Sequence, residues 1–107
     1  MARLTDIASY ADAQAEFSPA KLWELFDGDR AHLNIAHECI ERHAGRANPA
    51  VIVVRADGSS ETLSFRNIAE DSSRFAHWLV AAGVRPGDRV PVMLEPSRAF
   101  YAAVFGT

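Results

Sequence analysis

Residues 50–82 constrain the fold most, because two short β-branched runs are followed at once by a long amphipathic pattern. Ala50-Val51-Ile52-Val53-Val54 is too short and too branched for a helix, and predicts a strand with both faces largely covered. Asp57-Gly58-Ser59-Ser60 predicts a turn, and residues 61–65 return as a second strand. The pattern therefore predicts a β-hairpin.

A long helix is predicted over residues 65–82. Ser64 can cap it, with Asn67 as a weaker partner than the Glu of a full capping box. Gly83 can end it in the left-handed conformation, with Val84 folding back on the last turn. The stripe expected to be buried is Ile68, Ser72, Phe75, Ala76, Leu79 and Ala82, whereas Glu70, Asp71 and Arg74 are expected to face water.

The region after this helix predicts a turn, a strand and a final helix. Arg85-Pro86-Gly87-Asp88 has the residues of a type II turn. Residues 89–94 then predict a strand, in which Pro91 requires an edge position or a gap in the partner. The resulting strand–helix–strand spacing is that of a crossover unit on a sheet. Ser97 is expected to cap the last helix.

The first half of the chain predicts an arm followed by two helices. Residues 1–20 are expected to form an arm with a short helical turn. Pro19 opens a helix that reaches Phe26 and ends at Gly28. Asn34 caps a second helix that Gly45 ends. The residues expected near one face of that helix are Ile35, Ala36, Cys39, Ile40 and His43.

Composition excludes several classes of protein. Lys and Arg number 11 against 14 Asp and Glu, and the Arg residues are scattered among acids, so no basic patch suggests nucleic acid. No stretch approaches the length of a membrane span, and we expect no signal peptide in residues 1–14. Cys39 has no second cysteine to pair with, which favours a reducing compartment and a cytoplasmic location.

The last residues, 97–107, are strongly apolar and end without a polar turn. A helix this apolar must be covered, and we expect its cover to come from polypeptide beyond these 107 residues. The sequence is accordingly interpreted as the front piece of a larger protein, of the α/β class, with a small sheet flanked by helices.

From Leu33 onward the chain resembles the N-terminal end of the adenylate-forming (AMP-binding) enzymes. Asn34-Ile35-Ala36, with Trp23 in the upstream arm, is most similar to the acyl-CoA synthetase branch. The departures are Asn67, where the family often has an acidic or longer residue, and Pro91 within the last strand. The matching pieces are Leu33-Asn34-Ile35-Ala36, Pro49-Ala50-Val51-Ile52, Leu63-Ser64-Phe65-Arg66, Phe75-Ala76-His77-Trp78-Leu79, Gly83 to Val90, and Ala102 to Thr107.

This resemblance implies two parts and a reaction. Residues 1–32 would be an N-terminal arm with a short helix, and residues 33–107 the start of the large N-terminal AMP-binding domain. The whole enzyme would use Mg-ATP to convert a carboxylic acid to an acyl-adenylate, which the thiol of CoA then attacks. An adenylation domain that loads a carrier protein in place of CoA fits the resemblance equally.

The groups that such a reaction needs are not found in the sequence. It requires a Gly/Ser/Thr-rich phosphate loop, a metal-binding acid and a lysine. The six glycines stand singly, and the only lysine, Lys21, lies in the arm. We therefore assign no catalytic, cofactor-binding or metal-binding residue, and expect ATP, Mg and CoA to be held elsewhere in the larger protein. The piece itself is expected to be structural and inactive.

Several local groups have an ordinary structural interpretation. His32, His37, Cys39 and His43 do not share one helical face, so they predict surface histidines and one buried thiol rather than a metal site. Ser73 and His77 can touch, but nothing supplies an oriented base or an oxyanion hole. Glu70-Asp71 predicts a solvated face. Asp57-Gly58 and Pro86-Gly87-Asp88 predict turns.

The aromatic residues leave a second hypothesis open. Their ordinary role is core packing, but Trp78 lies off the main stripe of its helix. Exposed apolar surface drives association, so we expect these residues to self-associate, by exchange of the terminal helix. The alternative to a ligase is thus a self-contained small α/β interaction domain that dimerises through its C-terminal aromatic helix. The aromatic residues concerned are Trp23, Phe26, Trp78, Phe100, Tyr101 and Phe105.

Overall fold

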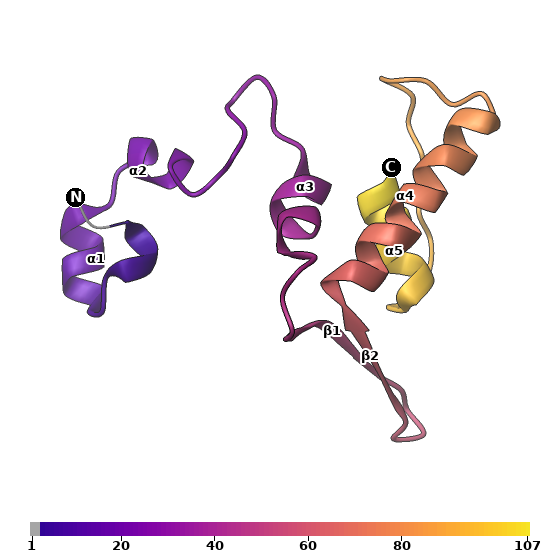
Figure 1. Ribbon diagram of the computed structural model, residues 1–107, viewed down its shortest axis with the longest axis horizontal. Coiled ribbons are helices and arrows are strands. Elements are labelled where there is room, and N and C mark those ends of the chain that lie inside the picture. Colours follow the sequence, from indigo (N-terminus) through magenta and orange to yellow (C-terminus); the bar gives the residue numbers. More distant parts are fainter. Residues whose placement is uncertain (1–2) are drawn as a thin grey trace. The chain divides into compact units, whose positions relative to one another are not determined.

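The computed structural model describes residues 3–107, and the chain divides into an N-terminal unit up to Asn34 and a C-terminal unit from Ile35 to Thr107. The N-terminal unit holds the short 3-10 helix η1 (Leu4–Asp6) and the helices α1 (Tyr10–Glu16) and α2 (Pro19–Trp23) (Figure 1). The boundary predicted after residue 32 stays a prediction.

Serine caps explain where the two helices of the N-terminal unit begin. The Ser9 hydroxyl accepts a hydrogen bond from the Asp12 N–H at 3.1 Å, and that of Ser18 accepts one from the Lys21 N–H at 3.2 Å. Pro19 occupies the first turn of α2, as predicted. The predicted extension to Phe26 is wrong, because α2 gives way after Trp23 to single i→i+3 turns.

The C-terminal unit contains a two-stranded antiparallel sheet and helices, which confirms the α/β class. Figure 1 shows the hairpin leading directly into the long helix α4, with α5 beside it. The elements in chain order are α3 (Ile35–Cys39), η2 (Glu41–His43), β1 (Pro49–Val54), β2 (Ser60–Ser64), α4 (Phe65–Ala81) and α5 (Arg98–Gly106).

The β1–β2 hairpin forms as predicted, with Val51 opposite Leu63 and Val54 opposite Ser60. Gly58 adopts a φ of +83° in the turn, a conformation that favours glycine. The prediction that both faces are covered is wrong. Val53 is buried, whereas Ile52 and Val54 are 58% and 70% exposed. They share one face of the strand, and a hairpin has only one face against the helices.

Helix α4 confirms the predicted cap and termination. The Asn67 N–H donates to the Ser64 hydroxyl, and the Ser64 N–H donates back to the Asn67 side chain, both at 3.1 Å. At the other end Gly83 has a φ of +89°, and the Val84 N–H donates to the Leu79 carbonyl. This is a Schellman ending. Ile68, Ser72 and Leu79 are buried as predicted, but Ala82 is exposed.

The single helix predicted after Asn34 is instead two short pieces, α3 and η2. Ile40 separates them with φ −125° and ψ −62°, which is not helical. Glu38 and Ile40 are buried, whereas Ile35 is 62% exposed. Cys39 is also exposed, so the prediction of a buried thiol is wrong.

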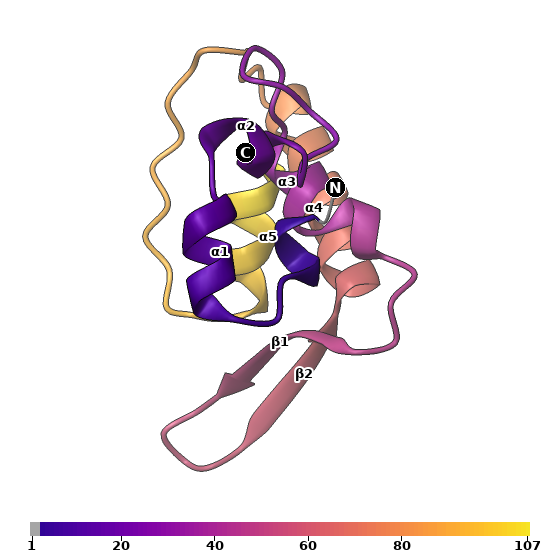
Figure 2. The same cartoon turned by 90° about the vertical axis from the view of Figure 1, so that its left-hand side faces the viewer.

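Residues 89–94 do not form the predicted strand. The turn before them is present, with the Asp88 N–H donating to the Arg85 carbonyl and a φ of +95° at Gly87. From residue 89 to Glu95 the chain carries no regular structure, and Figure 2 shows a drawn-out trace joining α4 to α5. No strand among residues 3–107 pairs with it, so the predicted crossover unit is absent from this part of the chain.

The core lies where the hairpin, α4 and α5 meet. Leu63 and Ile68 are 1% and 2% exposed, and Tyr101 and Phe105 of α5 pack against the same cluster. A Cβ on Gly106 would lie 2.6 Å from the Ser72 carbonyl oxygen, so α5 approaches α4 closely. We expected the apolar face of α5 to be buried only by polypeptide beyond these residues. That expectation is wrong for the side of α5 that packs on α4 and the core cluster. No helix within residues 3–107 has the length and apolarity needed to cross a membrane.

Candidate functional site

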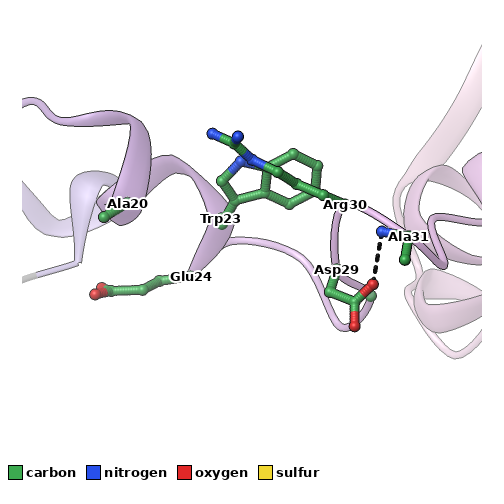
Figure 3. Close-up of a pocket in the computed structure, with 7 residues that line it drawn as sticks. Ala20, Trp23, Glu24, Asp29, Arg30 and Ala31 are labelled. Atoms are coloured by element: carbon green, nitrogen blue, oxygen red, sulfur yellow. Dashed lines mark hydrogen bonds between the residues drawn. The ribbon is translucent and has the colours of Figure 1, made fainter.

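A cavity in the N-terminal unit surrounds Trp23 and Arg30. It measures about 610 Å³, and its lining also includes Ala20, Glu24 and Asp29. The Arg30 guanidinium carbon lies 5.7 Å from the centre of the Trp23 ring, a cation–π contact. Figure 3 shows the guanidinium over the indole, with both carboxylates pointing away from it.

Asp29 fixes the backbone that carries Arg30. Its Oδ1 accepts hydrogen bonds from the N–H groups of Ala31 and His32, at 2.8 and 2.9 Å. These bonds, the one from Ala31 first, hold the pKa of the Asp29 carboxyl below its ordinary value of 3.8. The carboxylate is thus a structural acceptor at neutral pH. The cavity has an aromatic wall and a cation, without a group poised for proton transfer.

Each of the four histidines contacts a different group. His32 pairs with Asp29 in the N-terminal unit, and His37 lies 3.6 Å from the Glu41 carboxylate. His43 packs its ring edge-on against Phe65 at 5.5 Å. His77 Nδ1 contacts the backbone carbonyl of Ser73 at 2.8 Å rather than its hydroxyl. That contact leaves no Ser–His pair of the catalytic kind.

Asp71 has a role that the sequence did not reveal. We expected it to face water, but its side chain is only 15% exposed and binds Arg98 through two hydrogen bonds, of 2.6 and 3.2 Å. The bond to Asp71 raises the pKa of Arg98. Arg74 lies 3.4 Å from the same carboxylate. This bidentate link joins α4 to the first residue of α5.

Residues 3–107 do not fit a magnesium or nucleotide-phosphate site. No three His, Cys, Asp or Glu side chains in this range lie together as metal ligands. The three glycines with positive φ, Gly58, Gly83 and Gly87, each end a separate turn or helix instead of forming one phosphate loop. Lys21 is 8% exposed and binds Glu16 at 2.8 Å.

Comparison with known proteins places the C-terminal unit in a family. The model of the AMP-binding enzymes matches residues 40–107, which include the hairpin, α4 and α5. The chain belongs to the AMP-binding enzyme family. An acetyl-coenzyme A synthetase of Syntrophus aciditrophicus is 33% identical over 79 residues, which cover 64% of this chain and 12% of that protein.

Other relatives agree with this assignment. An acetyl-coenzyme A synthetase of Laribacter hongkongensis is 32% identical over 82 residues, covering 66% of this chain and 13% of its own length. Coprinoferrin synthetase of Coprinopsis cinerea is 37% identical over 83 residues, covering 69% of this chain and 3% of its own. The chain thus spans a small part of the length of these relatives. No solved structure matches.

The matched region and the Trp23–Arg30 cavity occupy different parts of the chain. The family match begins at residue 40, whereas the cavity is lined by residues up to Ala31. Within the matched region the polar contacts fix the backbone and join helices. The family match therefore covers the hairpin, α4 and α5, and leaves out the residues that line the cavity.

Proposed function

We propose that this chain supplies a supporting framework to an adenylate-forming ligase. The ligase would activate a carboxylic acid with ATP, giving an acyl-adenylate and pyrophosphate, and transfer the acyl group to the thiol of CoA. The observation that carries the proposal is the family match over residues 40–107, on the unit built from the hairpin, α4 and α5. The names of the acetyl-coenzyme A synthetase relatives support CoA as the acceptor.

Within this proposal residues 3–107 position other parts of the enzyme and hold no reacting group. Supporting this, the Asp71–Arg98 link joins α4 to α5 and uses the Asp71 carboxylate in a structural contact. Mg, ATP and CoA would be bound by residues outside this range. The cytoplasm is the proposed location, supported by the single cysteine, which has no internal partner.

The alternative, an interaction domain that dimerises through α5, has less support. Tyr101 and Phe105 pack against the core of their own unit, and Ala103 is buried at 4% exposure. These side chains are already used in holding α5 on α4. The apolar surface that α5 still offers centres on Val104, which is 44% exposed.

A chimeric enzyme tests the proposal. The 79 matched residues of the Syntrophus acetyl-coenzyme A synthetase would be replaced by the aligned residues of this chain. We expect a folded chimera with acetate-dependent pyrophosphate release, because the residues that bind ATP and acetate stay those of the parent. A chimera that melts in one cooperative transition like the parent, yet neither binds ATP nor releases pyrophosphate, would contradict the framework role.

The isolated 107-residue chain gives the complementary test. Incubated with Mg-ATP, CoA and a panel of carboxylic acids, it should release no pyrophosphate above background. Release that depends on both acid and ATP would show that reacting groups lie within these residues. The Asp71→Asn variant of the chain would then establish whether an acid of α4 takes part.

A further inference from the structure

The turn of the β1–β2 hairpin contains an aspartate followed directly by a glycine. Asp57 and Gly58 lie between Val54 and Ser60, which pair across the two strands. A glycine has no side chain, so its backbone nitrogen is unusually accessible to the side chain of the residue before it. The carboxyl of Asp57 and the nitrogen of Gly58 can therefore react with each other. Both groups belong to neighbouring residues, so this chemistry needs no other part of the protein.

The reaction of such a pair has two steps, and water is the only other reactant. In the first step the Gly58 nitrogen forms a bond to Cγ of Asp57. The nitrogen loses its proton and the carboxyl loses its hydroxyl, which leave together as water, and the product is a cyclic imide. In the second step water opens the imide. Opening at the backbone carbonyl leaves the chain running through Cβ and Cγ, which is isoaspartate.

The closed turn engages both reacting groups. The Gly58 N–H donates to the Arg55 carbonyl at 3.0 Å, and a bonded N–H releases its proton only when the structure opens. The Asp57 Oδ1 accepts a hydrogen bond from the Ser59 N–H at 2.9 Å. The Ser59 hydroxyl and then its N–H hold the pKa of the Asp57 carboxyl below its ordinary value of 3.8. At neutral pH the carboxyl is thus ionised and has no hydroxyl to release.

We propose that Asp57–Gly58 is a site of isoaspartate formation that the closed hairpin turn protects, with Ser59 as the protecting residue. The proposal does not depend on the ligase function. A hairpin opens and closes much faster than a covalent bond to an amide nitrogen forms. The rate of imide formation therefore follows the fraction of molecules in which the turn is open.

Isomerisation at this position would damage the hairpin itself. Isoaspartate adds one carbon atom to the backbone of the turn, and the turn fixes the register of a hairpin. A shifted register would turn Val53 and Leu63, which are 7% and 1% exposed, away from the core. The modified chain should therefore melt at a lower temperature than the unmodified chain.

Incubation of the 107-residue chain, folded and in guanidinium chloride, tests the proposal. Trypsin cuts after Arg55 and Arg66 and releases residues 56–66, in which electron-transfer fragmentation distinguishes aspartate from isoaspartate at position 57. We expect isoaspartate in the unfolded chain. In the folded chain it should form at least about threefold more slowly, because hydrogen bonds of the turn must first break.

Ser59→Ala separates protection by this side chain from protection by the turn as a whole. It should raise the rate in the folded chain by about threefold, because the contact of the hydroxyl with Asp57 is lost. In guanidinium chloride the variant and the wild type should react alike. Ser60→Ala is the matched control, since it removes a hydroxyl one residue further on and should leave the folded rate unchanged.

A second pair, Asp27–Gly28 in the N-terminal unit, gives an internal reference in the same samples, and its rate should be equal in the three folded chains. The proposal is overturned if residue 57 forms no isoaspartate in guanidinium chloride, or forms it as fast in the folded chain. It is also overturned if folded Ser59→Ala reacts no faster than folded Ser60→Ala.

Discussion

The β1–β2 hairpin and residues 89–95 have similar β-branched sequences and different structures. In the hairpin, β1 finds β2 across a short turn, and the pair leads into α4. Residues 89–95 follow an equally clear turn at Arg85–Asp88, but the next element is α5, a helix. A strand needs the hydrogen bonds of a neighbour, and only the hairpin has one close in sequence.

The difference shows which strand signals are local. β-branched residues indicate that a segment favours the extended conformation of a strand. Whether it forms a strand also depends on a second segment that supplies its hydrogen bonds. Where that partner is a few residues away, the sequence pattern predicts the structure correctly. Where it is distant or belongs to another molecule, the same pattern leaves an extended, unpaired chain.

Replacing the most buried hairpin residue should give the largest effect. Leu63→Ala removes a side chain that is 1% exposed from the core shared by β2, α4 and α5. We expect the free energy of unfolding to fall by about 3 kcal/mol, from lost burial and the cavity left behind. Urea unfolding followed by circular dichroism measures it.

The control for that experiment lies in residues 89–95. Met93→Ala removes a side chain of similar size that is 96% exposed, so the free energy of unfolding of a dilute sample should change by less than about 0.5 kcal/mol. Equal losses for the two variants would mean that residues 89–95 are packed as firmly as the hairpin. That result would remove the contrast between the two regions.

An intermediate effect is expected at the contact between α4 and α5, the two helices that residues 89–95 connect. A Cβ at Gly106 would lie 2.6 Å from the Ser72 carbonyl oxygen and 3.0 Å from the Phe75 ring. Gly106→Ala should therefore destabilise the chain by about 1–2 kcal/mol, even though alanine favours helices. Thermal melting measures the loss, with Gly45→Ala, which meets no atom within 4 Å, as control.

The smallest effect concerns the hairpin turn. The Ser59 hydroxyl and then its N–H, which donates to Asp57 at 2.9 Å, hold the pKa of the Asp57 carboxyl below 3.8. Because the folded pKa is lowered, its stabilisation is present above the unfolded pKa and is lost as pH falls through the folded value. Carbon-detected NMR titration should show Asp57 titrating below 3.8, and Ser59→Ala should raise that midpoint. An unchanged midpoint would contradict the role of the hydroxyl.

The predictable part of the fold is the part encoded by neighbours in sequence. Ser64 and Asn67 are three residues apart, and the helix end at Gly83 depends on the next residue. These were predicted correctly. The break at Ile40 was missed, because it reflects the packing of Ile40 into a core formed with Val53 and Leu63, which lie far along the chain.

In the candidate site, too, local features could be predicted from the sequence and long-range contacts could not. The sequence shows that its glycines stand singly and form no glycine-rich loop. It also predicts the turns at Gly58 and Gly87. The Asp71–Arg98 link spans 27 residues and had no sequence signal, since both are ordinary charged residues in helical positions. The stacking of Arg30 on Trp23 was likewise missed, because it depends on the turn that Asp29 fixes.

The Asp71–Arg98 link has a consequence for any chain that meets residues 89–95. The C-terminal end of α4 and its Schellman turn hold one end of the segment, and Arg98 secures the other to the middle of the same helix. Ordering one residue costs about 1–2 kcal/mol of conformational entropy. Residues 89–95 are held at both ends, so they have already lost part of that freedom before another segment pairs with them. Even a short contact with these residues can therefore be specific.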